Sequence, residues 1–243
     1  MSKLQNILDS FKLQDQLNPK IWNNPDDVEK STLKEKVKKG LFRISEEFID
    51  DLGENVPVKD VVLMGSLANY NWSKYSDFDL HVLVDFKKYK KDEELYRELF
   101  ELKKKVFNDK HDIKIYGYDV ELYAQGEDDP HSSSAVYSII KDEWIQKPKK
   151  EKVEIDFKFL KKKIECWVDK INDAIESEEI DRMKNLKEKI KDYRKSGLEK
   201  DGELSYENLV FKYLRRSGDI GNLFDKLGQE KDKKLSIEQK INE

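Results

Sequence analysis

Two segments in the first half of the chain place apolar residues at helical spacing. Residues 31–53, STLKEKVKKGLFRISEEFIDDLG, predict a helix with one buried stripe. This stripe consists of Leu33, Val37, Leu41, Ile44, Phe48 and Leu52. Thr32 followed by Glu35 predicts a capping box, and Gly53 predicts the C-terminal end. Residues 92–107, DEELYRELFELKKKVF, predict a second helix. Its stripe consists of Leu95, Leu99, Leu102 and Val106.

Strand patterns surround the second of these helices. DVVLMG (residues 60–65) is a short apolar run, and DFDLHVLVDF (77–86) alternates acid or His with apolar residues. IKIYGYDVELYAQ (113–125) predicts a further strand, and SAVYSIIKDEWIQKP (134–148) predicts a closing hairpin. The order helix, strand, strand, helix, strand, hairpin predicts an α/β domain with a mixed sheet flanked by helices.

Beyond this domain the pattern is helical throughout. Two long amphipathic helices are predicted from Leu160, Ile164, Trp167, Ile171 and Ile175, and from Ile180, Met183, Leu186, Ile190 and Tyr193. We expect a break at SGLEKDGE (196–203), two shorter helices in 205–216 and 219–227, and a frayed end from 228 onward.

These patterns divide the chain into three parts. Residues 1–30 contain LNPKIWNNPDD, with two prolines and an isolated tryptophan, and predict an irregular N-terminal arm lying on the following domain. Residues 31–150 form the α/β domain, and residues 151–243 form an all-helical C-terminal region.

Composition narrows the class of protein. The chain has 243 residues, 37% hydrophobic and 40% charged, with a net charge of -4. This balance argues against a generic, charge-driven nucleic-acid coat, which would be strongly basic. The single cysteine, Cys166, allows no internal disulfide and no cysteine metal cage. Without a long apolar run or a signal-like apolar block, we expect a cytoplasmic protein with no membrane partner.

The acids within the strands are the candidate chemistry. Alternation puts Asp77, Asp79 and His81 on one face of their strand, and two carboxylates about 7 Å apart repel each other unless a cation lies between them. On the later strand, Glu121 alternates in the same way. If the two strands are neighbours, Glu121 joins the aspartates. Three carboxylates suit Mg²⁺ or Mn²⁺, hard ions that take oxygen ligands.

Gly65 and Ser66 form a candidate phosphate cradle before these acids. They follow the preceding strand at the predicted start of a short helix, SLANYN. Helix N-termini offer unpaired N–H groups, glycine permits close approach, and the serine hydroxyl adds a donor. A cradle beside a carboxylate metal site is the arrangement required for nucleotidyl transfer.

The stretch MGSLANYNWSKYSDFDLHV resembles the signature of DNA-polymerase-β-type nucleotidyltransferases. In that family an apolar strand leads to Gly-Ser, then after about ten residues to two acids separated by one apolar residue. The version here is closest to the minimal and aminoglycoside nucleotidyltransferases. LNPKIWN and ENLVFKYLRR also resemble predicted nucleotidyltransferases of large bacteriophages. The resemblance covers residues 58 to about 125.

The resemblance implies a role for each matching residue. Gly65 and Ser66 would hold the triphosphate, and Asp77 and Asp79 would ligate two Mg²⁺ or Mn²⁺ ions. Glu121 would complete the second metal site and assist deprotonation of a hydroxyl that attacks the α-phosphorus and expels pyrophosphate. Asp119 is the alternative third acid; we favour the residue at 121 because apolar residues flank it.

Each feature also has a structural interpretation. The aspartates could lie on the solvated face of an edge strand, and Ser66 could cap a helix. His81 could contact nucleotide or metal, but we favour a hydrogen-bonded structural histidine. His131 could line the cleft or have no chemical role. In the lysine run 147–163 we favour aromatic residues in the core and lysines in solvent over a nucleic-acid face. Arg215 and Arg216 could reach a phosphate, but exposed paired arginines are common at helix ends.

Three functional classes follow. The first is an active, metal-dependent nucleotidyltransferase using a nucleoside triphosphate, with a tRNA, a protein or a small molecule as acceptor. The second is a catalytically weak nucleotide-binding protein, and the third is a toxin–antitoxin or defence partner. RNase domains often paired with minimal nucleotidyltransferases use Arg followed four to six residues later by His. No histidine occurs after His131, so the C-terminal half is not such an RNase.

Overall fold

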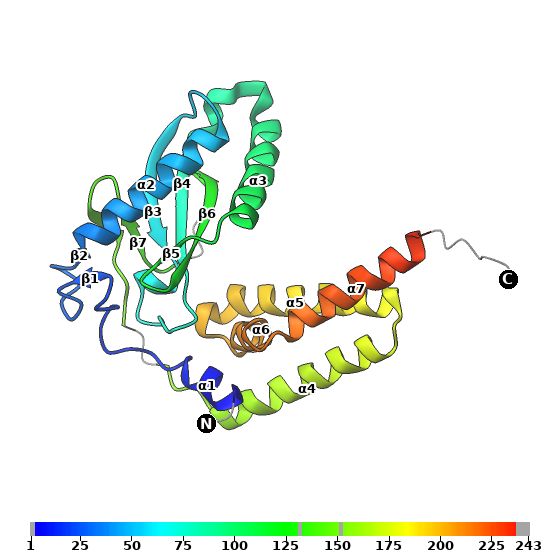
Figure 1. Ribbon diagram of the computed structural model, residues 1–243. Helices are drawn as coiled ribbons and strands as arrows, with labels where there is room; N and C mark the ends of the chain where they lie inside the picture. Colours follow the sequence, from blue (N-terminus) through cyan, green and yellow to red (C-terminus); the bar gives the residue numbers. More distant parts are fainter. Residues whose placement is uncertain (1–2, 131–132, 151–152, 237–243) are drawn as a thin grey trace. The chain divides into compact units, whose positions relative to one another are not determined.

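The computed structural model (Figure 1) describes residues 3–130, 133–150 and 153–236. Its contacts divide the chain into two units, described separately below. The sheet unit is Lys12–Glu151, and the helical unit is Met1–Phe11 with Lys152–Glu243. The first eleven residues therefore group with the C-terminal helices, and the rest of the expected N-terminal arm groups with the sheet.

The sheet unit is built on one mixed sheet, as the alternation patterns predicted. Its strands are β3 (Val58–Met64), β4 (Phe78–Val84), β5 (Lys114–Ile115), β6 (Tyr118–Gly126), β7 (Val136–Ser138) and β8 (Glu143–Gln146). The order is β5-β6-β4-β3-β7-β8; β4 and β6 are parallel, and every other pair is antiparallel. The predicted closing hairpin is confirmed as β7 and β8.

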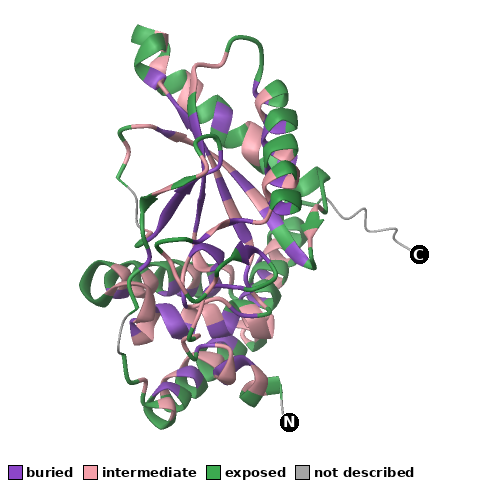
Figure 2. Cartoon of the chain, turned by 90° about the vertical axis from the view of Figure 1, so that its left-hand side faces the viewer, coloured by how far each residue is buried: buried purple, intermediate pink, exposed green. Residues whose placement is uncertain are grey.

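Helices α2 (Glu35–Leu52) and α3 (Glu93–Lys110) cover one face of this sheet. Phe48 of α2 and Phe107 of α3 meet edge to face with ring centroids 5.1 Å apart, over buried strand residues such as Leu80. The strands form the purple centre of Figure 2. Since side chains alternate across a strand, the intervening residues of β4 and β6 project from the opposite face.

The start of α2 differs from the prediction. The helix begins at Glu35 after Lys34, and no side chain caps it. Thr32 lies instead in β2 (Thr32–Leu33), which pairs with β1 (Trp22–Asn23), so it is not available for a capping box. Gly53 ends the helix as predicted, with φ of 129°.

The predicted stripe of α3 is not its buried face. Leu95 and Leu102 are 64% and 59% exposed, whereas Phe100 and Phe107 are buried against the sheet. The aromatic rings lie about a third of a turn from the leucines, and they remove more apolar area from water. Helical spacing therefore located the helix correctly but chose the wrong face.

The strand predicted over residues 113–125 is interrupted. Tyr116 and Gly117 both have positive φ, 51° and 86°, and join β5 to β6 in a tight hairpin. Two successive positive φ values are typical of two-residue hairpin turns, where glycine is favoured.

Trp22 anchors the N-terminal part of the sheet unit, where an irregular arm was expected. It is fully buried, stacks on Trp144 at 4.6 Å, and donates its indole N–H to the Leu67 carbonyl at 2.8 Å. Trp72 likewise donates to the Gln16 carbonyl at 2.9 Å. These bonds tie residues 16–22 to the loop that follows β3.

The helical unit consists of packed amphipathic helices. They are α1 (Lys3–Asp9), α4 (Phe157–Glu176), α5 (Ile180–Asp201), α6 (Tyr206–Ser217) and α7 (Asp219–Leu235). The predicted break at 196–203 is wrong for residues 196–201, because α5 continues to Asp201. A Cβ on Gly197 would lie 2.4 Å from the Glu207 Cβ, so this glycine permits close packing of α5 on α6.

The end of α7 also differs from the expected fraying, since the helix continues to Leu235; residues 237–243 lie outside the described residues. Within the described parts of the chain, no helix combines the length and apolarity that a membrane span requires.

Candidate active site

The parallel pairing of β4 and β6 brings the predicted acids together. Asp79 is the register partner of Glu121, and His81 is the partner of Tyr123. Asp77 lies one residue before β4. The two strands are therefore neighbours, which was the condition for Glu121 to join the aspartates. All these side chains project from the face opposite α2 and α3.

Asp77, Asp79 and Glu121 form a carboxylate triad. Each offers one oxygen, and the three oxygens lie within 4.8 Å of one another; the residues are half-buried. Like charges at this separation repel by about 1 kcal/mol per pair even in water, and by more where water is partly excluded. An all-oxygen donor set of this charge fits a hard divalent cation such as Mg²⁺ or Mn²⁺. The triad could therefore hold a metal ion.

Asp119, the alternative third acid, lies outside this group. Its carboxylate accepts a hydrogen bond from Lys114 Nζ at 2.6 Å, and its side chain is 63% exposed. The pairing is local, because Lys114 and Asp119 are register partners in the β5–β6 hairpin. The geometry therefore groups Glu121, and not Asp119, with the two aspartates.

Gly65 is in direct contact with the triad. It follows β3 with φ of 74° and ψ of -160°, a conformation essentially confined to glycine. A Cβ here would lie only 1.7 Å from Asp79 Oδ2. The sequence therefore has glycine at 65 for two reasons: the backbone turn requires it, and the Asp79 carboxylate occupies the space that a side chain would fill.

Ser66 lies in a single 3-10 turn, Ser66–Ala68, so the expected helix SLANYN is much shorter than predicted. The Asn69 side chain accepts from the Tyr70 N–H at 2.8 Å, and such local side-chain bonds compete with helix continuation. One turn carries no useful helix dipole. The Ser66 side chain makes no cap; its hydroxyl lies 2.7 Å from that of Ser76, one residue before the triad.

Comparison with known families decides the identity of this arrangement. A family model described as nucleotidyltransferase domain matches residues 45–196, more than half of the chain. The chain belongs to the nucleotidyltransferase domain family. The match begins within α2 and ends within α5, so it extends beyond the residues 58–125 that carry the sequence resemblance. No curated protein and no solved structure gave a significant match. The bacteriophage resemblance stays a prediction.

In this nucleotidyltransferase domain, Tyr123 supports the triad. Its hydroxyl donates to Glu121 Oε2 at 2.6 Å. Burial raises the pKa of Tyr123 far above its ordinary value, and the hydrogen bond to Glu121 and the negative charges of the triad raise it further. The phenol therefore stays protonated and acts as a fixed donor. Sequence reasoning gave it no role, although its position two residues after Glu121 puts both on one face.

His81 is a hydrogen-bonded residue beside the triad. Its Nδ1 lies 2.8 Å from Gln125 Oε1, and its ring stacks on Tyr123 with centroids 4.6 Å apart and planes at 15°. It is not one of the three grouped ligands. These contacts agree with the structural role that the sequence favoured. His131 lies outside the described residues.

The lysine-rich helix α4 leaves one of its aromatic residues largely in solvent. Phe159 is 46% exposed and meets Tyr206 edge to face, while Leu160, Ile164 and Ile171 are buried. The expectation of core aromatics was therefore wrong for Phe159. Apolar aliphatic positions define the buried face of this helix.

Arg216 is not simply exposed at a helix end. Its guanidinium donates to Ser10 Oγ at 2.8 Å and lies 5.0 Å from the Phe11 ring centroid. It therefore fixes the first residues of the chain to α6 within the helical unit. Arg215 is exposed, as predicted.

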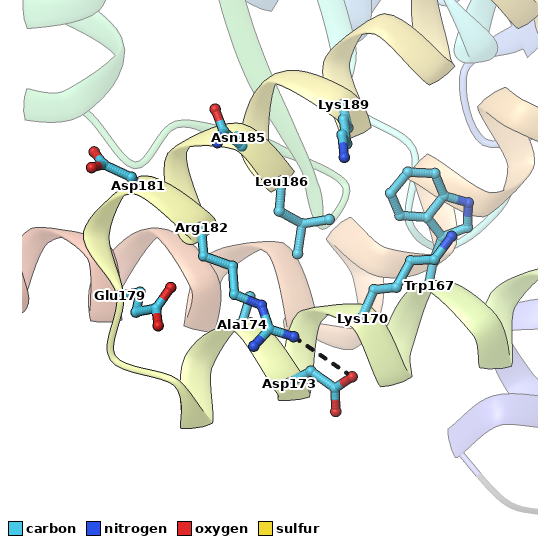
Figure 3. A pocket seen from close by; sticks show the side chains of 10 residues that line it. All are labelled: Trp167, Lys170, Asp173, Ala174, Glu179, Asp181, Arg182, Asn185, Leu186 and Lys189. Atoms are coloured by element: carbon cyan, nitrogen blue, oxygen red, sulfur yellow. Dashed lines mark ion pairs between the residues drawn. The ribbon is translucent and has the colours of Figure 1, made fainter.

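A hollow of about 520 Å³ lies between α4 and α5 in the helical unit (Figure 3). Its charged lining is Lys170, Lys189, Arg182, Asp173, Glu179 and Asp181. Figure 3 shows Arg182 directed at Asp173, 3.9 Å away. Acids and bases are balanced in number, so this hollow does not select ligands of one charge.

Proposed function

We propose that the protein is a metal-dependent nucleotidyltransferase that transfers a nucleoside monophosphate from a nucleoside triphosphate to a hydroxyl acceptor, with release of pyrophosphate. The family match supports nucleotidyl transfer in general. The observation that carries the proposal is the triad in contact with Gly65, because a divalent-ion site and a close-approach backbone then lie side by side.

Asp77, Asp79 and Glu121 would hold two Mg²⁺ or Mn²⁺ ions in this proposal. When bound, such ions neutralise triphosphate charge and make an attacking hydroxyl more acidic. The three carboxylates orient the reacting groups, and Glu121, fixed by Tyr123, assists removal of the proton from the acceptor hydroxyl.

Gly65 and Ser66 would bind the triphosphate. The absence of a side chain at Gly65 lets a phosphate approach the backbone closely. Ser66 Oγ now lies near Ser76 Oγ, and rotation about one bond lets the hydroxyl donate to a phosphate oxygen instead. The acceptor belongs to one of three classes, a tRNA, a protein or a small molecule.

Pyrophosphate release tests this function. Each of the four ribonucleoside triphosphates is supplied with Mg²⁺ or Mn²⁺, with and without total tRNA. We compare the wild type, the double variant Asp77→Asn/Asp79→Asn, and Asp119→Asn as a matched control on the same sheet. Release should require metal, fall at least about a hundredfold in the double variant, and remain in the control.

The nucleotide dependence of release would identify the donor, and its tRNA dependence would show whether tRNA is the acceptor. Release that persists in the double variant would contradict the assignment of the aspartates. Absence of both release and triphosphate-induced thermal stabilisation in the wild type would refute nucleotidyl transfer.

A further inference from the structure

The solvent-facing side of α3 carries a continuous apolar strip, which we call the α3 stripe. It consists of Leu95, Leu99, Leu102 and Val106, which are 64%, 38%, 59% and 47% exposed. Together they present a few hundred Å² of apolar surface, the size of the largest exposed apolar patch on a typical soluble monomer, and such patches are often functional. The helix is rigidly held, because Phe100 and Phe107 are buried against the sheet.

The spacing of the α3 stripe matches a helical partner. Its residues are separated by four, three and four positions, the pattern of the first and fourth positions of a coiled-coil heptad. Such a seam packs against another helix by inserting each side chain between four residues of the facing helix. A partner with a flat surface would not explain why the apolar residues follow this spacing.

We propose that the α3 stripe is the contact surface of a two-fold symmetric dimer, in which α3 of one copy packs antiparallel to α3 of a second copy. Charge complementarity selects this partner. Glu98 and Lys105 are exposed, lie seven residues apart, and therefore occupy the same heptad edge of the stripe. In an antiparallel pair, Glu98 of each copy faces Lys105 of the other, so two ion pairs form per dimer. The Lys105 ammonium lies 3.8 Å from Glu101 of its own helix, an exposed and weak pair that does not prevent this contact.

The opposite edge of the stripe disfavours a parallel pair. There the Tyr96 ring stacks on Tyr89 at 3.8 Å, and Lys103 Nζ donates to the Asp51 carbonyl at 2.6 Å. Parallel packing would direct Glu98 toward Lys103, whose ammonium is already bound, and would place Lys105 beside another lysine, Lys110. The antiparallel arrangement leaves both local contacts intact.

The size of the surface predicts a weak dimer. An 18-residue helix is about 27 Å long, and a single helix pair lies at the low end of stable interfaces. We expect a dissociation constant on the order of 10 µM. The dimer leaves the carboxylate triad accessible, since the triad and α3 lie on opposite faces of the sheet, so this inference does not depend on the proposed function.

Sedimentation velocity of the full chain, from about 1 to about 200 µM, tests the proposal. The wild type should convert from monomer to dimer within this range. Leu95→Gln/Leu102→Gln should stay monomeric throughout. Ile145→Gln, which changes an exposed apolar residue on β8, is the matched control and should dimerise like the wild type.

Charge exchange tests the antiparallel register. Glu98→Lys alone and Lys105→Glu alone should each weaken dimerisation about tenfold, because each creates like-charge pairs. The double variant Glu98→Lys/Lys105→Glu should restore the wild-type constant to within about twofold. All changed residues are exposed, and urea unfolding confirms that each variant is folded.

A wild type that remains monomeric over the whole range would overturn the proposal and point to a different occupant of the stripe. A dimer that persists in Leu95→Gln/Leu102→Gln would place the interface elsewhere. Failure of the double charge exchange to restore dimerisation would exclude the antiparallel pair.

Discussion

At the scale of single residues, the triad gathers three carboxylates in one place. Its three oxygens lie within 4.8 Å of one another, and the Tyr123 hydroxyl fixes one of the carboxylates by donating to Glu121. A donor to the outer oxygen of a ligand orients that ligand and sets its affinity for metal. In the proposed metal site, Tyr123 would therefore act by fixing Glu121 and not as a ligand.

Tyr123→Phe removes only this hydroxyl. We expect Mn²⁺ affinity to fall about tenfold, because Glu121 loses its orienting donor. Stability should change by about 1 kcal/mol or less. Electron paramagnetic resonance of unbound Mn²⁺ measures the affinity. Tyr116→Phe, at an exposed turn residue, is the control and should bind as the wild type does; equal binding by both variants would contradict the role of Tyr123.

Gly65→Ala introduces a methyl group where the Asp79 carboxylate lies. We expect Mn²⁺ affinity to fall by at least tenfold, since Asp79 must move away from the triad. Gly117→Ala is a matched control: φ is also positive, 86°, and no atom lies within 4 Å of the added carbon. Gly117→Ala should lose about 1–2 kcal/mol of stability. Gly65→Ala should lose more, because its backbone strain alone costs about 1–3 kcal/mol and the added methyl also displaces Asp79. Intact metal binding in Gly65→Ala would show that the contact with Asp79 does not matter.

Much of the residue-scale picture follows from the sequence. Alternation alone places Asp77 and Asp79 on one face, and Glu121 on one face of a later strand. It does not state which strands are neighbours, or that Lys114 binds Asp119 across a tight hairpin. Those facts depend on strand register, which is set by contacts far apart in the chain. The contact of Gly65 with Asp79 likewise depends on the register between β3 and β4, where Met64 lies opposite Asp79.

At the scale of elements, helix α3 shows where periodicity stops being informative. The helix contains two apolar sets, the α3 stripe and the aromatic pair Phe100 and Phe107, and each has helical spacing. The sheet buries the set with the larger rings. When a helix has two apolar faces, the sequence predicts the helix but not which face is buried, because tertiary packing decides that. The face that is left uncovered is then available for a partner.

The two faces of α3 should differ sharply in their effect on stability. Phe100→Ala should lower the free energy of unfolding by about 3–5 kcal/mol, because it opens a cavity in the core. Leu102→Ala should change it by about 0.5 kcal/mol or less, since that side chain is 59% exposed. Urea unfolding at submicromolar concentration, where dimerisation is negligible, measures both. Equal losses would mean that the stripe is buried.

At the scale of the whole molecule, the chain forms two units whose boundary does not follow the order of the sequence. Helix α1 packs on α6, and Arg216 binds Ser10, so the first residues complete the helical unit. Ile7 and Leu8 are buried there. The sequence predicted an arm on the sheet domain, because a seven-residue helix has too little periodicity to reveal where its apolar face docks.

Deleting residues 1–9 should therefore destabilise the helical unit selectively. Hydrogen exchange should become faster in α6, where α1 no longer covers apolar residues, while β3, β4 and β6 keep their protection. Ile7→Ser in the full chain should show the same pattern. Loss of protection in the sheet, with α6 unchanged, would contradict the assignment of the N-terminal residues to the helical unit.

The central claim is that Asp77, Asp79 and Glu121 together form a divalent-metal site. Titration of the full chain with Mn²⁺, followed by electron paramagnetic resonance, tests it most directly in the wild type, Asp79→Asn and Asp119→Asn. Asp79→Asn should weaken binding at least tenfold, because one of the three grouped carboxylates is removed. Asp119→Asn should bind as the wild type does. Equal Mn²⁺ affinity in all three proteins, or no binding by the wild type, would contradict the account.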